Sequence, residues 1–168
     1  MPKARARAER VLSKRPELFT IGYEGSTQAA LLVALRRAGV ALLIDVRAVA
    51  ASRKPGLSKK LLGASLEATG IRYLHLQALG TPKPGRDAAR AGRIAEMHRI
   101  FRAHMESDRA QADLAAARAA TTAASACLLC FERDHRACHR DLVAEMISTT
   151  TGQRIVHLEP EPVGVLGA

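Results

Sequence analysis

The chain has 168 residues, of which 48% are hydrophobic and 25% charged, a composition typical of a single soluble domain with its own core. Its net charge of +10 makes a polyanionic partner a candidate. No run of eighteen apolar residues occurs, which argues against a membrane partner, and no signal-peptide pattern precedes Leu18. Three clustered cysteines argue against a disulfide framework and favour a reducing, cytoplasmic location.

The two ends differ in composition from the middle of the chain. Residues 1–17 hold six basic and two acidic residues, so we predict a basic, flexible tail that either solubilises the protein or contacts nucleic acid. Residues 159–168, with two prolines and two glycines, predict a loose C-terminal tail. The folded domain is therefore expected to span residues 18–158.

The first half of this domain alternates strand and helix signals. Residues 18–23 predict a strand, and Ser26 or Thr27 can cap a helix that ends at Gly39. Residues 40–46 are nearly all apolar, which is typical of a strand covered on both faces. A polar loop with Pro55-Gly56, a helix over 58–68 and a strand over 71–76 follow.

The second half begins with an irregular connection over Gly80–Gly85. From Asp87, apolar residues recur at three- and four-residue spacing up to Met105 and predict one amphipathic helix. Later segments predict an Ala-rich helix at 109–124, a strand ending at Cys130, a helix after Cys138 and a fifth strand at 154–158. The pattern indicates a single three-layer α/β domain with a mainly parallel sheet of about five strands and helices on both faces.

Parallel strands end at one edge of a sheet, so the polar residues that follow each strand should meet there. We expect a cleft formed by Tyr23, Glu24, Asp45, Arg47, Ser52, Arg53, His75, Cys130, Glu132, Cys138, His139 and Arg140. Its centre is the stretch from Cys127 to Arg140, where a short apolar strand breaks into charge just before a helix. The start of a helix offers unpaired N–H groups and partial positive charge to an anion.

Roles within this cleft follow from side-chain chemistry. Cys130 is the expected reactive group, with a pKa lowered by nearby positive charge. Glu132, His139 and Asp45 are expected proton or orientation partners; Arg47, Ser52, Arg53 and Arg140 are expected to bind an anion; Tyr23, Glu24, His75 and Cys138 complete the cleft. Structural roles remain open: a thiol can simply pack, His75 can be a satisfied core histidine, and Arg140 can pair with Asp45 or Glu132.

Several separate motifs carry a family resemblance. They are Thr20-Ile21-Gly22-Tyr23, Leu43-Ile44-Asp45-Val46-Arg47, Ser52-Arg53-Lys54-Pro55-Gly56-Leu57-Ser58, Tyr73-Leu74-His75-Leu76 with Leu79-Gly80, and Leu129-Cys130-Phe131-Glu132 with Cys138-His139-Arg140. In this order they resemble the DUF488 family of bacterial and archaeal proteins of unassigned function. The resemblance covers roughly residues 18–158. It implies one α/β domain and supports these residues as a site, but it supplies no reaction.

Thiol chemistry is the leading interpretation of the site. The layout is similar to that of rhodanese-type sulfurtransferases, and Cys130 to Arg136 has the C-x5-R spacing of phosphatase loops. The intervening residues contain two carboxylates and no glycine, which disfavours both of those loops. A nucleophilic Cys130 acting on a phosphate- or nucleotide-like anion remains the expectation, and no cofactor is expected.

Two other interpretations stay open. Cys130, Cys138 and His139 could supply three metal ligands, with Glu132 or His75 as a fourth, although a Cys127/Cys130 chelate is disfavoured by strand geometry. The basic tail with Arg47, Arg53, Lys54, Lys59 and Lys60 could instead bind nucleic acid, although no known nucleic-acid-binding motif is legible. The sequence does not indicate the oligomeric state.

Overall fold

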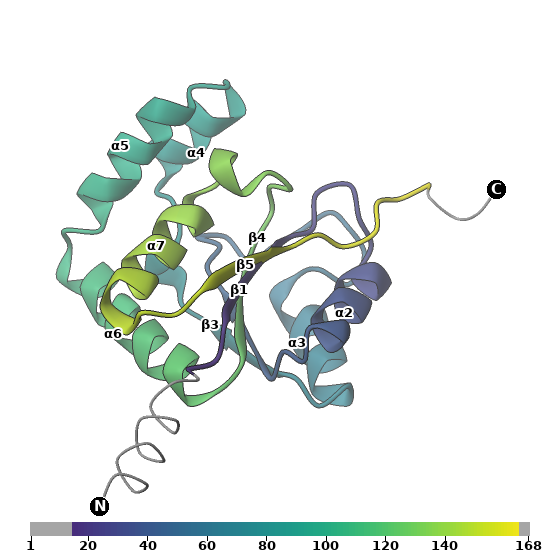
Figure 1. The fold of residues 1–168 in the computed structure, drawn as a ribbon. Coiled ribbons are helices and arrows are strands. Elements are labelled where there is room, and N and C mark those ends of the chain that lie inside the picture. Colours follow the sequence, from purple (N-terminus) through teal and green to yellow (C-terminus); the bar gives the residue numbers. More distant parts are fainter. Residues whose placement is uncertain (1–14, 165–168) are drawn as a thin grey trace, which may run out of the picture.

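The computed structural model describes residues 15–164, and its centre is a five-stranded parallel sheet (Figure 1). The strands are β1 (Leu18–Gly22), β2 (Leu42–Asp45), β3 (Arg72–His75), β4 (Ala126–Cys130) and β5 (Ile155–Leu158). Their order across the sheet is β3-β2-β4-β1-β5. Each strand lies within about two residues of a segment that the sequence predicts, and the α/β class is confirmed.

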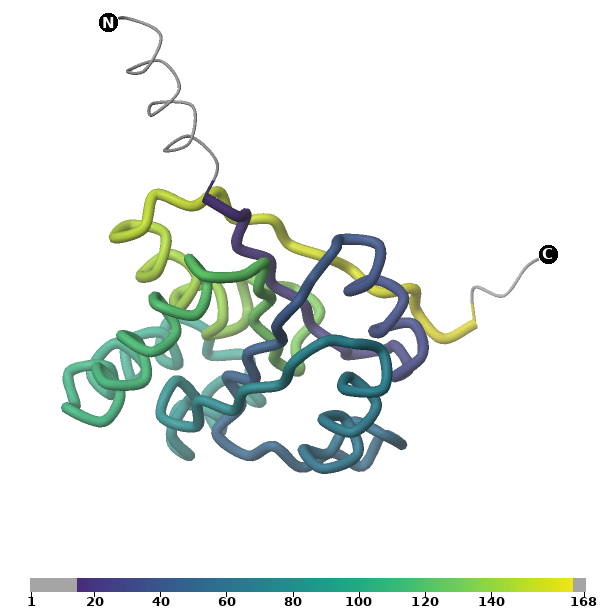
Figure 2. The backbone as a smooth tube through the Cα atoms, turned by 90° about the horizontal axis from the view of Figure 1, so that it is seen from below, coloured from purple at the N-terminus to yellow at the C-terminus, as the bar shows by residue number. Residues whose placement is uncertain are grey.

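Helices cover both faces of the sheet (Figure 2). One face packs against α2 (Gln28–Arg37) and α3 (Lys59–Ala68), through side chains such as Leu31, Leu35, Leu62 and Leu66. The other packs against α5 (Ile94–His104), α6 (Asp108–Ala123) and α7 (His139–Thr151), while α4 (Lys83–Arg90) packs on α5. Side chains of β4 alternate between the two cores, so Leu128 and Cys130 face α7 and Cys127 and Leu129 face α2 and α3.

The prediction of one amphipathic helix from Asp87 to Met105 is wrong. Helix α4 begins at Lys83, inside the segment expected to be irregular, and ends at Arg90. The chain then turns at Gly92, whose φ of 76° is left-handed and favours glycine, before α5 begins at Ile94. The turn folds α4 back over α5, so α4 reaches the edge of the sheet where the strands end (Figure 1).

The order of the strands creates a crevice between β2 and β4. The chain leaves β2 toward β3 on one side and leaves β4 toward β5 on the other. Neighbouring strands whose connections diverge in this way leave an opening beyond their carboxyl ends, which is where α/β sheets bind ligands. Asp45 and Leu129 are paired across this point, so the residues just after them line the crevice.

Parts of both tails lie outside the described residues: 1–14 of the predicted basic tail and 165–168 of the predicted loose tail. The segment directly after β5 is held in place, since Ser26 Oγ donates to the Glu161 carbonyl at 2.6 Å and the Val163 N–H to the Gly25 carbonyl at 2.7 Å. It therefore lies along the loop between β1 and α2. Across residues 15–164, no helix is both long enough and apolar enough to cross a membrane.

Candidate functional site

A cavity of about 810 Å³ opens at the carboxyl ends of the strands, bounded by the loops after β2 and β4 and by α4 and α5. Eight of the twelve predicted site residues line it: Tyr23, Glu24, Arg47, Ser52, Arg53, Cys130, Glu132 and His139. The other four, Asp45, His75, Cys138 and Arg140, lie behind its wall. The structure therefore brings the predicted residues to one place but separates those that face the cavity from those that support it.

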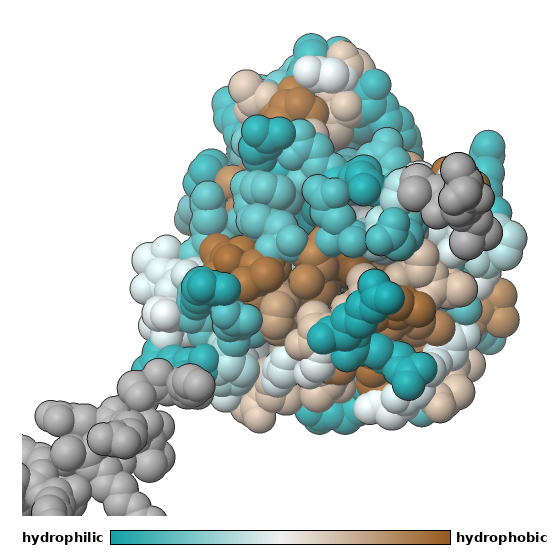
Figure 3. All heavy atoms as spheres, turned by 45° about the vertical axis from the view of Figure 1, so that its right-hand side comes forward, coloured by the Kyte–Doolittle hydropathy of each residue, from teal (hydrophilic) through white to brown (hydrophobic). Residues whose placement is uncertain are grey.

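The helical hairpin of α4 and α5 supplies lining residues that the sequence analysis missed. Arg86 and Arg90 come from α4, and Ile94 and Met97 from α5. The four-residue spacing of the two arginines, which places them on one helical face, was the available signal, but the segment was not recognised as a separate helix. The upper part of the molecule, where this hairpin lies, is mostly hydrophilic in the face shown in Figure 3, above a band of apolar surface.

Positive charge predominates in the cavity lining. Arg47, Arg53, Lys54, Arg86 and Arg90 face three carboxyl groups, those of Glu24, Glu132 and Asp134. Apolar side chains alternate with these charges, among them Phe131, whose ring meets Tyr23 edge to face at 5.4 Å between centroids. A cavity with cationic anchors and an apolar wall suits an anion that carries a flat or apolar group.

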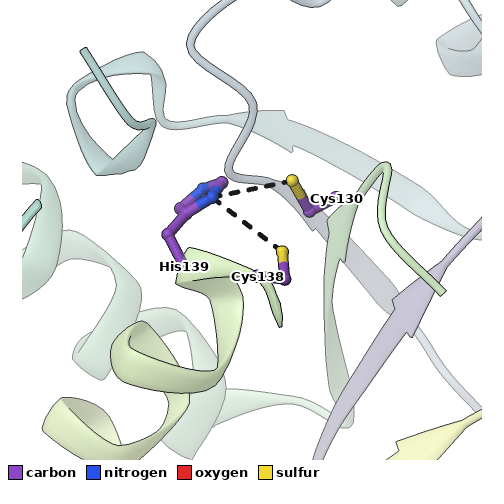
Figure 4. Close-up of side chains that lie close together, drawn as sticks. All are labelled: Cys130, Cys138 and His139. Atoms are coloured by element: carbon purple, nitrogen blue, oxygen red, sulfur yellow. Dashed lines mark hydrogen bonds between the residues drawn. The ribbon is translucent and has the colours of Figure 1, made fainter. Parts of the chain in front are cut away.

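Two thiols and an imidazole meet at the inner wall of the cavity (Figure 4). Cys130 ends β4, while Cys138 caps the N-terminus of α7 and His139 is its first residue. His139 Nδ1 lies 3.7 Å from Cys130 Sγ and 3.9 Å from Cys138 Sγ. All three side chains are at most 5% exposed. The group is close-packed, but only Cys130 and His139 reach the cavity.

The orientation of the His139 ring is set by its other nitrogen. Nε2 lies 2.8 Å from the backbone carbonyl of Val46, which can only accept a hydrogen bond, so Nε2 carries a proton. Nδ1 is then the nitrogen that faces both sulfur atoms. In the neutral ring it presents a lone pair to them, and in the protonated ring it donates a proton to a thiolate.

Electrostatics favour the anionic form at Cys138 and not at Cys130, contrary to the sequence-based expectation. Burial opposes ionisation of Cys138, but the hydrogen bond from Cys130 and the positive charges of His139 and Arg140 hold its pKa well below the usual range. The Arg140 N–H also points at Cys138 Sγ, at 3.5 Å, as befits a helix N-terminus. The hydrogen bond to Cys138, followed by burial and the negative charges nearby, raises the pKa of Cys130.

Glu132 lies beside Cys130 at the same wall. Its Oε2 is 3.3 Å from Cys130 Sγ, so the single S–H of Cys130 has three acceptors within reach: Glu132, Cys138 and, when its ring is neutral, His139 Nδ1. Burial, together with the negative charge of Cys138, raises the pKa of Glu132 to about 7. A carboxyl group with that pKa exchanges protons readily near neutral pH.

Arg140 holds the loop that carries Glu132. Its side chain is 1% exposed, and its guanidinium donates to the backbone carbonyls of Glu132 and Arg133 and to Thr20 Oγ1. These partners are neither a substrate anion nor the Asp45 or Glu132 carboxylate considered from the sequence. With its donors directed inward, Arg140 supports the cavity wall from behind.

Asp45, the last residue of β2, forms a buried ion pair with Arg47 in the loop that follows. Two Arg47 nitrogens donate to the two carboxylate oxygens at 2.9 and 2.7 Å, and Tyr73 O–H donates to Oδ2 at 2.5 Å. Arg47 Nη1 also donates to Tyr23 O–H and to the Leu57 carbonyl. Asp45 is fully buried, so it orients Arg47 and does not face the cavity.

His75 and a second cluster of polar residues complete this edge of the sheet. His75 Nε2 bonds the Arg47 carbonyl at 2.8 Å, so the imidazole props the loop after β2. On the far side of the loop after β4, the rings of His135 and His157 stack at 3.5 Å and share the Asp141 carboxylate. The sequence analysis did not select this second cluster.

Comparison with known proteins gives one match. A family described as "Domain of unknown function DUF488" matches residues 27–147 of the chain. No curated protein and no solved structure matches the chain.

Proposed function

The chain belongs to the DUF488 family, and we propose that this member is a cysteine-dependent enzyme acting on an anionic, phosphate- or nucleotide-like substrate. The observation that carries the proposal is that Cys130, Glu132 and His139 line the same cavity as a set of basic side chains. Reactive groups and anion anchors thus open onto one volume, at the crevice where α/β sheets bind ligands. The three free, buried thiols support a reducing, cytoplasmic setting for this enzyme.

We assign anion binding to the basic residues that line the cavity and are not held in a buried ion pair. Arg47 and Arg140 are committed to buried partners, whereas Arg53, Lys54, Arg86 and Arg90 lie around the opening. Guanidinium groups bind phosphate oxygens bidentately, which orients the anion as well as attracting it. The apolar wall that contains Phe131, Ile94 and Met97 accommodates the rest of the substrate.

Chemistry falls to the inner wall. Cys130 is the thiol that reaches the cavity, and His139 Nδ1, at 3.7 Å, is in position to accept its proton. Glu132 lies on the other side of the same sulfur and offers a second site for proton transfer. Asp45 orients Arg47, and Cys138 and Arg140 shape the wall from behind. Each of these side chains is thus assigned either to contact with the substrate or to support of the cavity wall.

Thiol labelling tests the reactive group. Because Cys130 lines the cavity and Cys127 is fully buried against α2 and α3, Cys130 should react with iodoacetamide faster than Cys127 in the folded protein. Mass spectrometry of time-resolved labelling measures both sites in one sample. Labelling of both at the same slow rate would contradict a reactive role for Cys130.

Anion binding tests the cavity. Replacing Arg86 and Arg90 by serine should weaken binding of phosphate or a nucleoside monophosphate by at least about tenfold, because charge-assisted hydrogen bonds are lost. The matched control is Arg36→Ser with Arg37→Ser, which removes two exposed arginines from α2 and leaves the cavity intact. Equal weakening in both double variants would favour non-specific electrostatics, as in a basic nucleic-acid-binding module, over a substrate cavity.

A further inference from the structure

We propose that Cys130, Cys138 and His139 are three ligands of a zinc-type divalent metal ion whose fourth position opens into the cavity. This inference rests on the proposed function, because it places the metal ion at the same cavity. It adds a role for the two thiols, Cys130 and Cys138. With an ion bound, Cys130 serves as a ligand and not as the free thiol proposed above, and Glu132 is the polar group left beside the open position.

The spacing of the three ligand atoms fits such an ion. The two sulfurs and Nδ1 lie within 4.8 Å of one another, and the sulfur-to-nitrogen distances are 3.7 and 3.9 Å. In tetrahedral zinc, with bonds of about 2.3 Å to sulfur and about 2.0 Å to nitrogen, a sulfur and a nitrogen ligand lie roughly 3.6 Å apart. Both sulfur-to-nitrogen distances are therefore within a few tenths of an ångström of those in a zinc site.

The surroundings orient these atoms as they do in metal centres. His139 donates Nε2–H to the Val46 carbonyl, which leaves the Nδ1 lone pair facing the sulfurs; a histidine ligand characteristically donates its other N–H to a carbonyl or carboxylate. A backbone N–H from Arg140 points at Cys138 Sγ. The Phe101 ring lies against His139, with centroids 5.3 Å apart, and shields the site from the core side.

The number and kind of ligands select the ion and its role. Two thiolates and an imidazole favour zinc over magnesium or calcium, which prefer oxygen ligands. Three protein ligands with an open fourth position are the arrangement of catalytic zinc, whereas structural zinc is closed by four. Here the open side faces the cavity, because Cys130 and His139 line it and Cys138 does not.

The second group of ligand-type residues is less suited to an ion. His135 and His157 stack with their ring planes 7° apart, so the lone pairs in those planes run side by side instead of converging on one point. Asp141 already bonds His135 Nδ1 at 3.0 Å. This group therefore provides a control: its loss should leave zinc binding unchanged.

Zinc titration of the full-length, tag-free, reduced and chelator-treated protein tests the proposal, with a chromophoric chelator as competitor. Wild type, Cys127→Ala and His157→Gln should each bind one zinc ion per chain. Cys130→Ala and Cys138→Ala should lose affinity by more than the roughly 10–100-fold that loss of a supporting residue costs. Cobalt in place of zinc should give thiolate-to-metal absorption that disappears in the same two variants. Retained binding in Cys138→Ala, or no binding by wild type, would overturn the proposal.

A measurement on the wild-type chain alone removes any dependence on variants that fold poorly. Zinc should slow alkylation of Cys130 and Cys138 relative to the metal-free protein, and labelling unaffected by zinc would count against the site. Phosphate binding measured in the same samples separates the two proposals. Zinc binding without phosphate binding would overturn the proposed substrate class and leave the metal site standing. Phosphate binding without zinc binding would overturn the metal site and leave the proposed substrate class standing.

Discussion

Two buried polar groups lie at the same edge of the sheet and differ in how well their partners satisfy them. After β2, the Asp45 carboxylate accepts hydrogen bonds from Arg47 and Tyr73 at 2.5 to 2.9 Å, and Arg47 reaches two further acceptors. After β4, Cys130, Cys138 and His139 are joined by long sulfur contacts of 3.7 and 3.9 Å.

The difference indicates what each group does. A fully satisfied buried ion pair is rigid and costly to disturb, so it serves as a wall for the cavity. A group of polarisable atoms with weak mutual contacts can accept a new partner without losing strong bonds. Both groups contain residues that the sequence analysis chose as site candidates, so residue type does not distinguish them. Whether a group's hydrogen bonds are satisfied does distinguish supporting residues from reactive ones at this edge.

Breaking the satisfied group should have the largest effect on stability. Asp45→Ala leaves the Arg47 charge buried without its carboxylate, so the free energy of unfolding should fall by about 3–5 kcal/mol. Urea denaturation measures the loss. Asp87→Ala is the control, because Asp87 lies in exposed ion pairs with Lys83 and Arg90 that water screens, and its stability should barely change. Similar stability in both variants would show that the buried pair of Asp45 and Arg47 contributes no more to stability than the exposed pairs of Asp87.

Removing the support of the β4 loop should have an intermediate effect. Arg140→Met keeps most of the side-chain volume but leaves the Glu132 and Arg133 carbonyls without their donor, at a cost of about 1–3 kcal/mol. The loosened loop should also make Cys130 alkylate faster, which labelling kinetics measure. Arg136→Met, which affects only an exposed pair with Asp134, should change neither quantity. Unchanged labelling in Arg140→Met would show that Arg140 does not hold the site.

The smallest expected effect concerns pH and the stacked histidines. Burial, and then the positive charge of His135, lower the pKa of His157, which Asp141, Thr20 and Arg140 also face. In the unfolded chain the pKa of a histidine is about 6.5, so the unfolded chain binds the proton more readily than the folded one. The lowered pKa of His157 therefore costs no folding stability above that pH, and the folded state loses stability as the pH falls below it.

Replacement of His157 isolates this contribution. His157→Gln should weaken the loss of stability on acidification between about pH 7 and pH 5, measured by urea denaturation at several pH values. Identical pH profiles for wild type and variant would show that the stacked pair does not contribute. The result also bears on the comparison of the two regions, because this pair lies behind the loop that carries Glu132.

The positions of the strands and the place of the site were predictable from the sequence. Apolar runs such as residues 40–46 are long and local, and parallel connections bring the strand ends to one edge, so Cys130, Glu132 and Arg53 could be placed together before any coordinates. The break at Gly92 was not predicted, because the single helix inferred from the apolar spacing after Ile94 was extended back to Asp87. As a result, Arg86 and Arg90 were missing from the predicted site.

Local pattern thus determined the architecture and the edge at which polar residues gather, because hydrophobic periodicity depends on neighbours in the chain. The tertiary structure alone decided the partners. Arg140 bonds Thr20, 120 positions away, and His139 bonds Val46, 93 positions away. Hydrogen bonds and pKa shifts depend on separations of a few ångströms between distant segments, and no local pattern encodes them. For that reason the structure placed the favoured thiolate on Cys138, behind the cavity wall, and left Cys130 facing the cavity.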